Sequence, residues 1–173
     1  MATLAPAFSP KHMDYQRIFE EINEEIKNDA PCGEVASYIP ELGRVDPNKF
    51  GVHLTTVNGE HYSFGDSDEK FSIQSIAKVL SLAMAYKLEG EALWERVGVE
   101  PSGTPFNSLV QLEYDMGIPR NPFINAGALV IADILVSHLA NPKEEFIRFV
   151  REVSGNNEID YCTRIAESEK SMG

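Results

Sequence analysis

The chain has 173 residues and a formal net charge of −12, and 43% of its residues are hydrophobic. This composition is typical of a globular protein, and the length is close to the ~150 residues of one ordinary domain. The acidic balance excludes a broad surface for nucleic acid or for an anionic membrane, because either surface requires a basic face. We therefore expect neither a nucleic-acid partner nor a membrane partner.

The N-terminus and the cysteines indicate the compartment. The first twelve residues contain no basic stretch followed by an apolar one, which a secretory signal would have. Cys32 and Cys162 lie too far apart in the sequence to suggest a disulfide framework or a zinc site. We expect a cytoplasmic protein that uses no metal and no other cofactor.

In chain order, the first predicted elements are a flexible arm over residues 1–13, a helix over 14–27 and a hairpin over 50–64. The arm contains prolines, and the helix has apolar residues at helical spacing. Apolar and polar residues alternate in the hairpin, and Asn58-Gly59 predicts a two-residue type I′ turn, since both central positions need a positive φ. A two-stranded hairpin is marginal in water, and no partner strands for it are visible elsewhere in these residues.

A helical pattern follows the hairpin. It predicts a helix that begins at Ser75 and stops at Gly90, and a short amphipathic helix over 91–97. Residues 98–124 contain several prolines and glycines, which predict an irregular connection. A connection of this length is more often functional than idle.

Three more helices are predicted towards the C-terminus. The first, over 126–139, is apolar almost all round and is expected to be a central buried helix. The second begins at Pro142 and stops at Gly155. The last begins near Asn157. Its predicted inner face consists of Ile159, Cys162, Ile165 and Ala166.

The sharpest local pattern is a serine followed by a lysine three positions later, Ser75 and Lys78, at the start of a predicted helix. Residues three apart share a helix face, and the positive end of the helix dipole favours an oxyanion near the serine. A lysine that burial keeps neutral can accept the serine proton, and Ile76, Val79 and Leu80 are expected to supply the apolar wall. This is the Ser-x-x-Lys device of serine hydrolases. The alternative is a helix-capping serine beside a solvated lysine.

Three further side chains are candidates for binding. Asn125 precedes small residues that allow close approach, or it caps the helix that follows it. Glu169 falls on the predicted apolar stripe of the last helix, where a carboxylate needs a partner, unless that helix ends before it. Tyr38 lies on a loop that ends in proline, and its surroundings in the sequence favour a packing role. The four histidines show no metal-ligand spacing.

These features belong to five segments that follow one another in order. The segments are residues 33–42, the hairpin turn at 58–59, residues 71–78, residues 121–128 and Ser168-Glu169. Together they resemble the serine-dependent glutaminases, which have a β-lactamase-like fold. The resemblance implies an α/β (α+β) protein in which a helical cluster accompanies part of an antiparallel sheet. It extends from Asp14 to the end, so residues 14–173 are expected to form the N-terminal part of a single domain.

The resemblance also implies an activity, which is hydrolysis of L-glutamine to L-glutamate and ammonia. Ser75 looks like the nucleophile of this family, and Lys78 looks like its activating base. Three residues look like substrate contacts, namely Asn125, Glu169 and Tyr38. The Glu169 side chain would recognise the α-amino end of glutamine. Family members assemble as dimers or tetramers, so a homo-oligomer is expected.

The chain departs from the family at its C-terminal end, because family members are longer and carry more of the pocket and of the sheet. We therefore expect a truncated piece that has no activity by itself. Two other functions remain open, namely another Ser-x-x-Lys hydrolase of the β-lactamase or penicillin-binding type and a non-catalytic helical module. Labelling of Ser75 by a glutamine-like electrophile, by a β-lactam or by neither would separate the three.

Overall fold

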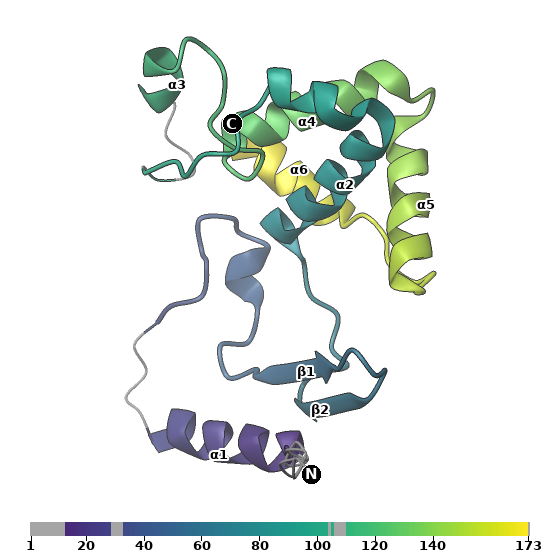
Figure 1. Cartoon of the computed structure of the whole chain (residues 1–173). Coiled ribbons are helices and arrows are strands. Elements are labelled where there is room, and N and C mark those ends of the chain that lie inside the picture. Colours follow the sequence, from purple (N-terminus) through teal and green to yellow (C-terminus); the bar gives the residue numbers. More distant parts are fainter. Residues whose placement is uncertain (1–12, 29–32, 104, 106–109, 173) are drawn as a thin grey trace, which may run out of the picture. The chain divides into compact units, whose positions relative to one another are not determined.

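The computed structural model divides the chain into two compact units (Figure 1). It describes residues 13–28, 33–103, 105 and 110–172. The first unit comprises the residues up to Phe71 together with those from Thr163 onwards, and the second comprises Ser72–Cys162. The predicted arm over 1–13 lies almost entirely outside the described residues, and the single domain over 14–173 stays a prediction. Within the described residues, no helix is long and apolar enough to span a membrane.

The first unit is built on one helix and one hairpin. Helix α1 (Tyr15–Asn28) packs against strand β2 (His61–Gly65), which pairs antiparallel with strand β1 (Gly51–Thr55). Alternate side chains of the two strands are half-buried and share one face of the hairpin. They are Val52, Leu54, Tyr62 and Phe64. The rings of Tyr15 and Tyr62 lie 5.1 Å apart between their centroids. The predicted first helix and the predicted hairpin are confirmed.

The turn of the hairpin differs from the prediction. The Gly59 N–H donates to the Thr56 carbonyl at 3.0 Å, so the central residues of the turn are Val57 and Asn58. Gly59 has a φ of 80°, whereas Asn58 is not among the described non-glycine residues with a positive φ. A type I′ turn needs a positive φ at both central residues, so the prediction of that turn type was wrong. Glycine alone takes the left-handed conformation here.

The first unit also contains a short 3₁₀ turn, η1 (Leu42–Arg44), and helix α6 (Thr163–Met172). Helix α6 begins later than predicted, and its predicted inner face does not form. Ile159 and Cys162 precede the helix, and Cys162 and Ala166 are exposed. The segment before the helix makes a tertiary contact instead, because the Ile159 carbonyl accepts a hydrogen bond from the Arg151 side chain on α5 at 2.7 Å.

The second unit is a cluster of helices around a buried core (Figure 1). Helix α2 (Ala77–Glu89) packs against α4 (Asn125–His138), α5 (Pro142–Ser154) and the 3₁₀ helix η3 (Gly90–Glu95). The core residues are Ala85, Leu93, Val97, Ile131, Ile134 and Leu135. Gly155 ends α5 with a φ of 66°, as its position after the apolar stripe predicts.

Helix α4 is not buried on every side, contrary to the prediction. Ile131 and Ile134 are buried in the core, but Leu129 and Val136 on the same helix are exposed. Within the described residues, α2 and the neighbouring elements of the second unit cover one face of α4 only. The apolar sequence of α4 is therefore a poor guide to its burial, because composition does not say how many neighbours a helix has.

The described residues of the connection over 98–124 are irregular, as predicted, apart from a short helix, α3 (Val110–Tyr114). Its two ends lie side by side. The Gly98 N–H donates to the Pro119 carbonyl at 2.7 Å. A Cβ atom at Gly98 would lie 2.7 Å from the Arg120 carbonyl oxygen, so only glycine permits this approach.

The core of the second unit generates a stability prediction. Ile134→Ala should lower the free energy of unfolding by about 2–5 kcal/mol, because Ile134 is 0% exposed and its truncation leaves a cavity. Val136→Ala is the matched control on the same helix, since Val136 is 65% exposed, and it should change the free energy by less than about 0.5 kcal/mol. Urea unfolding followed by circular dichroism measures both. Equal effects of the two substitutions would contradict the described core.

Candidate active site

Ser75 lies in the 3₁₀ turn η2 (Gln74–Ile76), which leads directly into α2. Its side chain is exposed. Gln74, immediately before it, has a φ of 44°, which is unusual for a residue other than glycine and costs on the order of 1–3 kcal/mol. Strain of this kind clusters at functional sites, where the surrounding structure maintains it.

The structure does not support a capping role for Ser75. The N-cap residues of η2 and α2 are Ile73 and Ile76, and neither helix has a side-chain cap hydrogen bond. The Ser75 hydroxyl therefore lies at the positive end of α2 without capping it. This is the position in which the helix dipole favours a developing negative charge.

Lys78 is half-buried in the first turn of α2. Its Nζ donates to the Phe123 carbonyl oxygen at 2.9 Å and to Asn125 Oδ1 at 2.8 Å. Burial lowers the pKa of Lys78 below its ordinary value, because removal from water disfavours the charged ammonium. Both of these oxygen partners are neutral, so neither adds a full negative charge that would reverse the direction of the shift.

The predicted apolar wall around Lys78 was wrong in its composition. Ile76 is 60% exposed and Val79 is 54% exposed. Positions one and two residues away on a helix point to other faces, so these side chains do not cover the lysine. Two hydrogen-bond partners of Lys78 come from residues 123–125, which lie far from it in the sequence.

Asn125 is the first residue of α4, and the N-cap position belongs to Ile124. The capping interpretation of Asn125 was therefore wrong, because its side-chain oxygen accepts a hydrogen bond from Lys78 instead. The small residues after Asn125 do allow a close approach, and the partner is backbone. A Cβ atom at Gly127 would lie 1.9 Å from the Asn121 carbonyl oxygen.

The structure brings the amine of Lys78 and the carboxamide of Asn125 together, one helical turn from Ser75. Tyr38 and Glu169 belong to the first unit. Tyr38 is exposed. Helix α6 continues past Glu169, so the alternative that this helix ends before it was wrong. The Glu169 side chain is nevertheless exposed rather than on a buried stripe.

Sequence reasoning missed the Phe123 carbonyl and the side chain of Asn121. The latter accepts hydrogen bonds from the backbone N–H groups of Phe123 and Ile124 at 3.0 and 3.1 Å. One signal was available, since an asparagine followed by a proline is typical of a turn, and Asn121-Pro122 is such a pair. Nothing in the sequence indicates that this turn faces Lys78.

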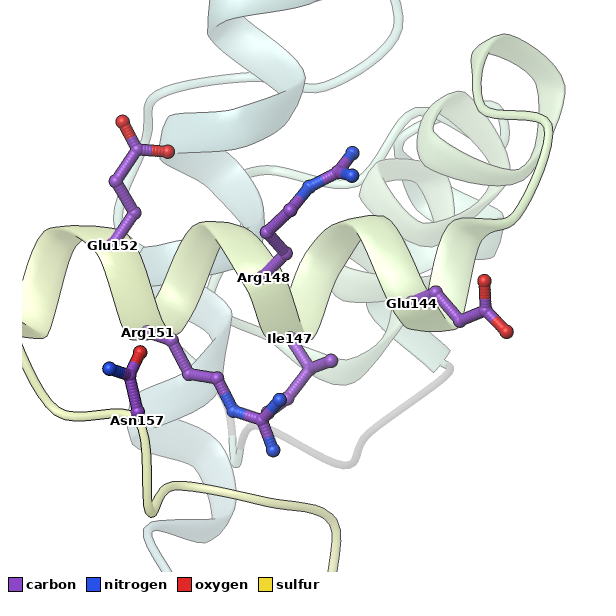
Figure 2. Close-up of a pocket in the computed structure, with 6 residues that line it drawn as sticks. All are labelled: Glu144, Ile147, Arg148, Arg151, Glu152 and Asn157. Atoms are coloured by element: carbon purple, nitrogen blue, oxygen red, sulfur yellow. The ribbon is translucent and has the colours of Figure 1, made fainter.

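A depression lies on α5 (Figure 2). Its lining consists of Glu144, Ile147, Arg148, Arg151, Glu152 and Asn157. The guanidinium groups of Arg148 and Arg151 leave the helix in different directions, so they do not converge on one point (Figure 2). None of the predicted site residues lines this depression. Among the described residues, no group of three or more His, Cys, Asp and Glu side chains could hold a metal ion.

Solved structures with a similar fold are glutaminases. The structure described as the probable glutaminase ybaS has a TM-score of 0.80 and 28% identity, over 92% of this chain and 52% of that one. A structure of Mglu in its tris and glutamate form has a TM-score of 0.76 and 31% identity, over 94% of this chain and 36% of that one. The predicted α/β class, with a β-lactamase-like fold, is confirmed.

The sequence comparisons identify the family. The Glutaminase family model matches residues 33–173. A glutaminase of Saccharophagus degradans is 62% identical over 93% of this chain, and one of Christiangramia forsetii is 60% identical over 93% of it. The chain therefore belongs to the glutaminase family. It spans about half the length of these relatives, 52% and 53% respectively.

The surroundings of Lys78 predict its titration. In competitive acylation with a trace of acetic anhydride, Lys78 should reach half of its maximal rate at a lower pH than a lysine in an unstructured reference peptide, because burial lowers its pKa. Mass spectrometry of the peptides measures the rate at each pH. The same measurement in denaturant is the control, and there the difference should vanish. A half-maximal rate at the pH of the reference peptide in the folded chain would contradict this prediction.

Proposed function

We propose that this chain is part of an enzyme that hydrolyses L-glutamine to L-glutamate and ammonia, with Ser75 as the nucleophile and Lys78 as its base. One observation supports this proposal above all others. In a member of the glutaminase family, an amine whose pKa is lowered by burial lies one helical turn from an exposed serine at a helix start. A serine and a neutral amine in this relation form an activated nucleophile.

The reaction takes place in two stages. In the first stage, Ser75 Oγ bonds to the side-chain carboxamide carbon of glutamine as its proton passes to Lys78. The helix start stabilises the resulting oxyanion, and the carbon–nitrogen bond then breaks as the leaving nitrogen takes the proton from Lys78. Ammonia departs and a glutamyl ester of Ser75 remains. In the second stage, water attacks the ester carbon as its proton passes to Lys78. Lys78 then gives this proton to Ser75 Oγ as the ester bond breaks, which releases glutamate and restores both side chains.

The geometry around Lys78 favours the role of a base. A neutral amine has two N–H groups and one lone pair. The Phe123 carbonyl and the Asn125 carboxamide are acceptors for two N–H groups of Lys78. With these two directions set, the proton that Lys78 gains or loses occupies a remaining tetrahedral position of the nitrogen.

The substrate contacts are also part of this proposal. Glu169 is assigned to the α-ammonium group of glutamine, Tyr38 to the wall of the same pocket, and Asn125 to both Lys78 and substrate. A solved relative, Mglu, was described in a glutamate form, and glutamate is the product of the proposed reaction. Assembly as a dimer or tetramer and a cytoplasmic location stay predictions. Family membership favours this activity over that of a β-lactamase or a non-catalytic module.

Ser75→Ala tests the nucleophile. In a form of the protein that has the full length of its relatives, this substitution should lower kcat/KM for glutamine by at least about a hundredfold, because the ester can no longer form. Ser81→Ala is the matched control on α2, since the Ser81 hydroxyl donates to the Lys78 carbonyl within the helix. Ammonia release measures both, and the 173-residue chain alone should release none. Turnover of Ser75→Ala within tenfold of wild type would exclude Ser75 as the nucleophile.

Glu169→Gln tests the assignment of this carboxylate to substrate binding. The substitution should raise KM for glutamine more than it lowers kcat, because it removes a charge-assisted hydrogen bond to the substrate ammonium, at a cost of roughly 1.5–3 kcal/mol. Glu167→Gln is the control, since Glu167 is an exposed carboxylate two positions earlier on α6. Steady-state kinetics in the full-length form separate the two parameters. An unchanged KM with a reduced kcat would instead place Glu169 in the chemical step.

A further inference from the structure

Asn121 uses both ends of its side chain to hold the segment that supplies the oxygen partners of Lys78. Its Oδ1 accepts hydrogen bonds from the backbone N–H groups of Phe123 at 3.0 Å and Ile124 at 3.1 Å. Its Nδ2 donates to the Glu100 carbonyl at 2.9 Å. We call residues 121–124 the bracing turn. The carbonyl of Phe123 within this turn accepts a hydrogen bond from Lys78.

The bracing turn is anchored to a second stretch of backbone. Gly98 donates to the Pro119 carbonyl at 2.7 Å, and Glu100 donates to the Arg120 carbonyl at 2.8 Å. The bond from Asn121 to the Glu100 carbonyl therefore extends a short ladder that already joins these stretches. These hydrogen bonds attach the bracing turn to residues 98–100, which are distant from it in the sequence.

The other end of the bracing turn is fixed by the start of α4. Pro122 is buried, and its ring limits its own φ. Gly127 lies so close to the Asn121 carbonyl that a Cβ atom would be 1.9 Å from it. The position of Asn125, at the first residue of α4, is thus tied to the same turn.

We propose that Asn121 is a positioning residue for Lys78, because it fixes the turn that directs the Phe123 carbonyl and the Asn125 carboxamide at the lysine amine. Asn121 acts through these two groups, which lie 2.9 and 2.8 Å from Lys78 Nζ. This inference extends the proposed function, in which Lys78 is the base. Phe123 lies in the bracing turn and Asn125 follows it directly, so movement of the turn would redirect the amine. A misplacement of about 1 Å can cost a hundredfold in rate.

A second consequence concerns water. Lys78 is half-buried, and burial is the cause that lowers its pKa. If the turn loosens, water replaces the two fixed oxygens and solvates the ammonium. The pKa of Lys78 then rises towards the ordinary lysine value. This direction distinguishes a loosened turn from loss of acceptors alone, which would disfavour the ammonium and lower the pKa further.

The experiment is the competitive acylation of Lys78, applied to variants of this chain. In Asn121→Ala, the pH of the half-maximal rate should rise by about half a unit or more towards that of the reference peptide. Asn121→Ser keeps an uncharged oxygen that can accept a backbone N–H, so it should restore most of the wild-type value. Asn156→Ala is the matched control, because Asn156 in the same unit accepts the Glu158 N–H at 2.9 Å but holds no partner of Lys78. It should leave the Lys78 value unchanged.

Two results would overturn the inference. One is an unchanged Lys78 value in a folded Asn121→Ala chain. The other is an equal rise in Asn156→Ala, which would indicate general loosening of the unit. If thermal melts show that Asn121→Ala does not fold, Asn121→Leu replaces it, because leucine has a similar size but cannot accept the Phe123 and Ile124 N–H groups. An unchanged Lys78 value in that variant would overturn the inference. The readout needs no turnover, so its failure leaves the glutaminase proposal to the Ser75→Ala experiment, and a failure there leaves the role of Asn121 intact.

Discussion

The interaction on which the candidate site depends is the contact of the Lys78 amine with two neutral oxygens. It joins the first turn of α2 to the Phe123 carbonyl and to Asn125 at the first residue of α4, 45 and 47 positions away in the sequence. Burial of an amine is unfavourable unless its N–H groups have acceptors. The Phe123 carbonyl and the Asn125 carboxamide are such acceptors, and burial lowers the pKa of Lys78. A carboxylate at the same place would favour the ammonium and raise that pKa.

Two local features lie beside this contact. Gln74 has a positive φ immediately before Ser75, which is unfavourable for a residue other than glycine, and Gly127 brings the start of α4 against the Asn121 carbonyl. The core that α2 and α4 share, which includes Ala85 and Ile131, offsets the cost at Gln74 by burying apolar surface. The same packing that stabilises the helical cluster therefore fixes the geometry of the candidate site.

Membership of the glutaminase family supports the proposed reaction at this site. The family match extends over residues 33–173, which include all five predicted site residues. The chain covers about half the length of its relatives, so the proposed activity is that of the longer protein. The residues proposed as nucleophile, base and one substrate contact lie in the second unit, while Tyr38 and Glu169 lie in the first. The described contacts that support the proposal most directly are the hydrogen bonds of Lys78.

The sequence by itself determined most element boundaries and the Ser-x-x-Lys spacing, because these depend on neighbours a few residues apart. Apolar periodicity located α1, and Pro142 and Gly155 located both ends of α5. Only the tertiary structure decided what surrounds each element. Lys78 donates hydrogen bonds to oxygens of residues 123–125 rather than lying behind the predicted apolar wall. One face of α4 is exposed. Helix α6 begins later than predicted, after a segment in which the Ile159 carbonyl accepts a hydrogen bond from Arg151. Each of these outcomes depends on a residue distant in the chain or on the number of packed neighbours, and local sequence patterns specify neither.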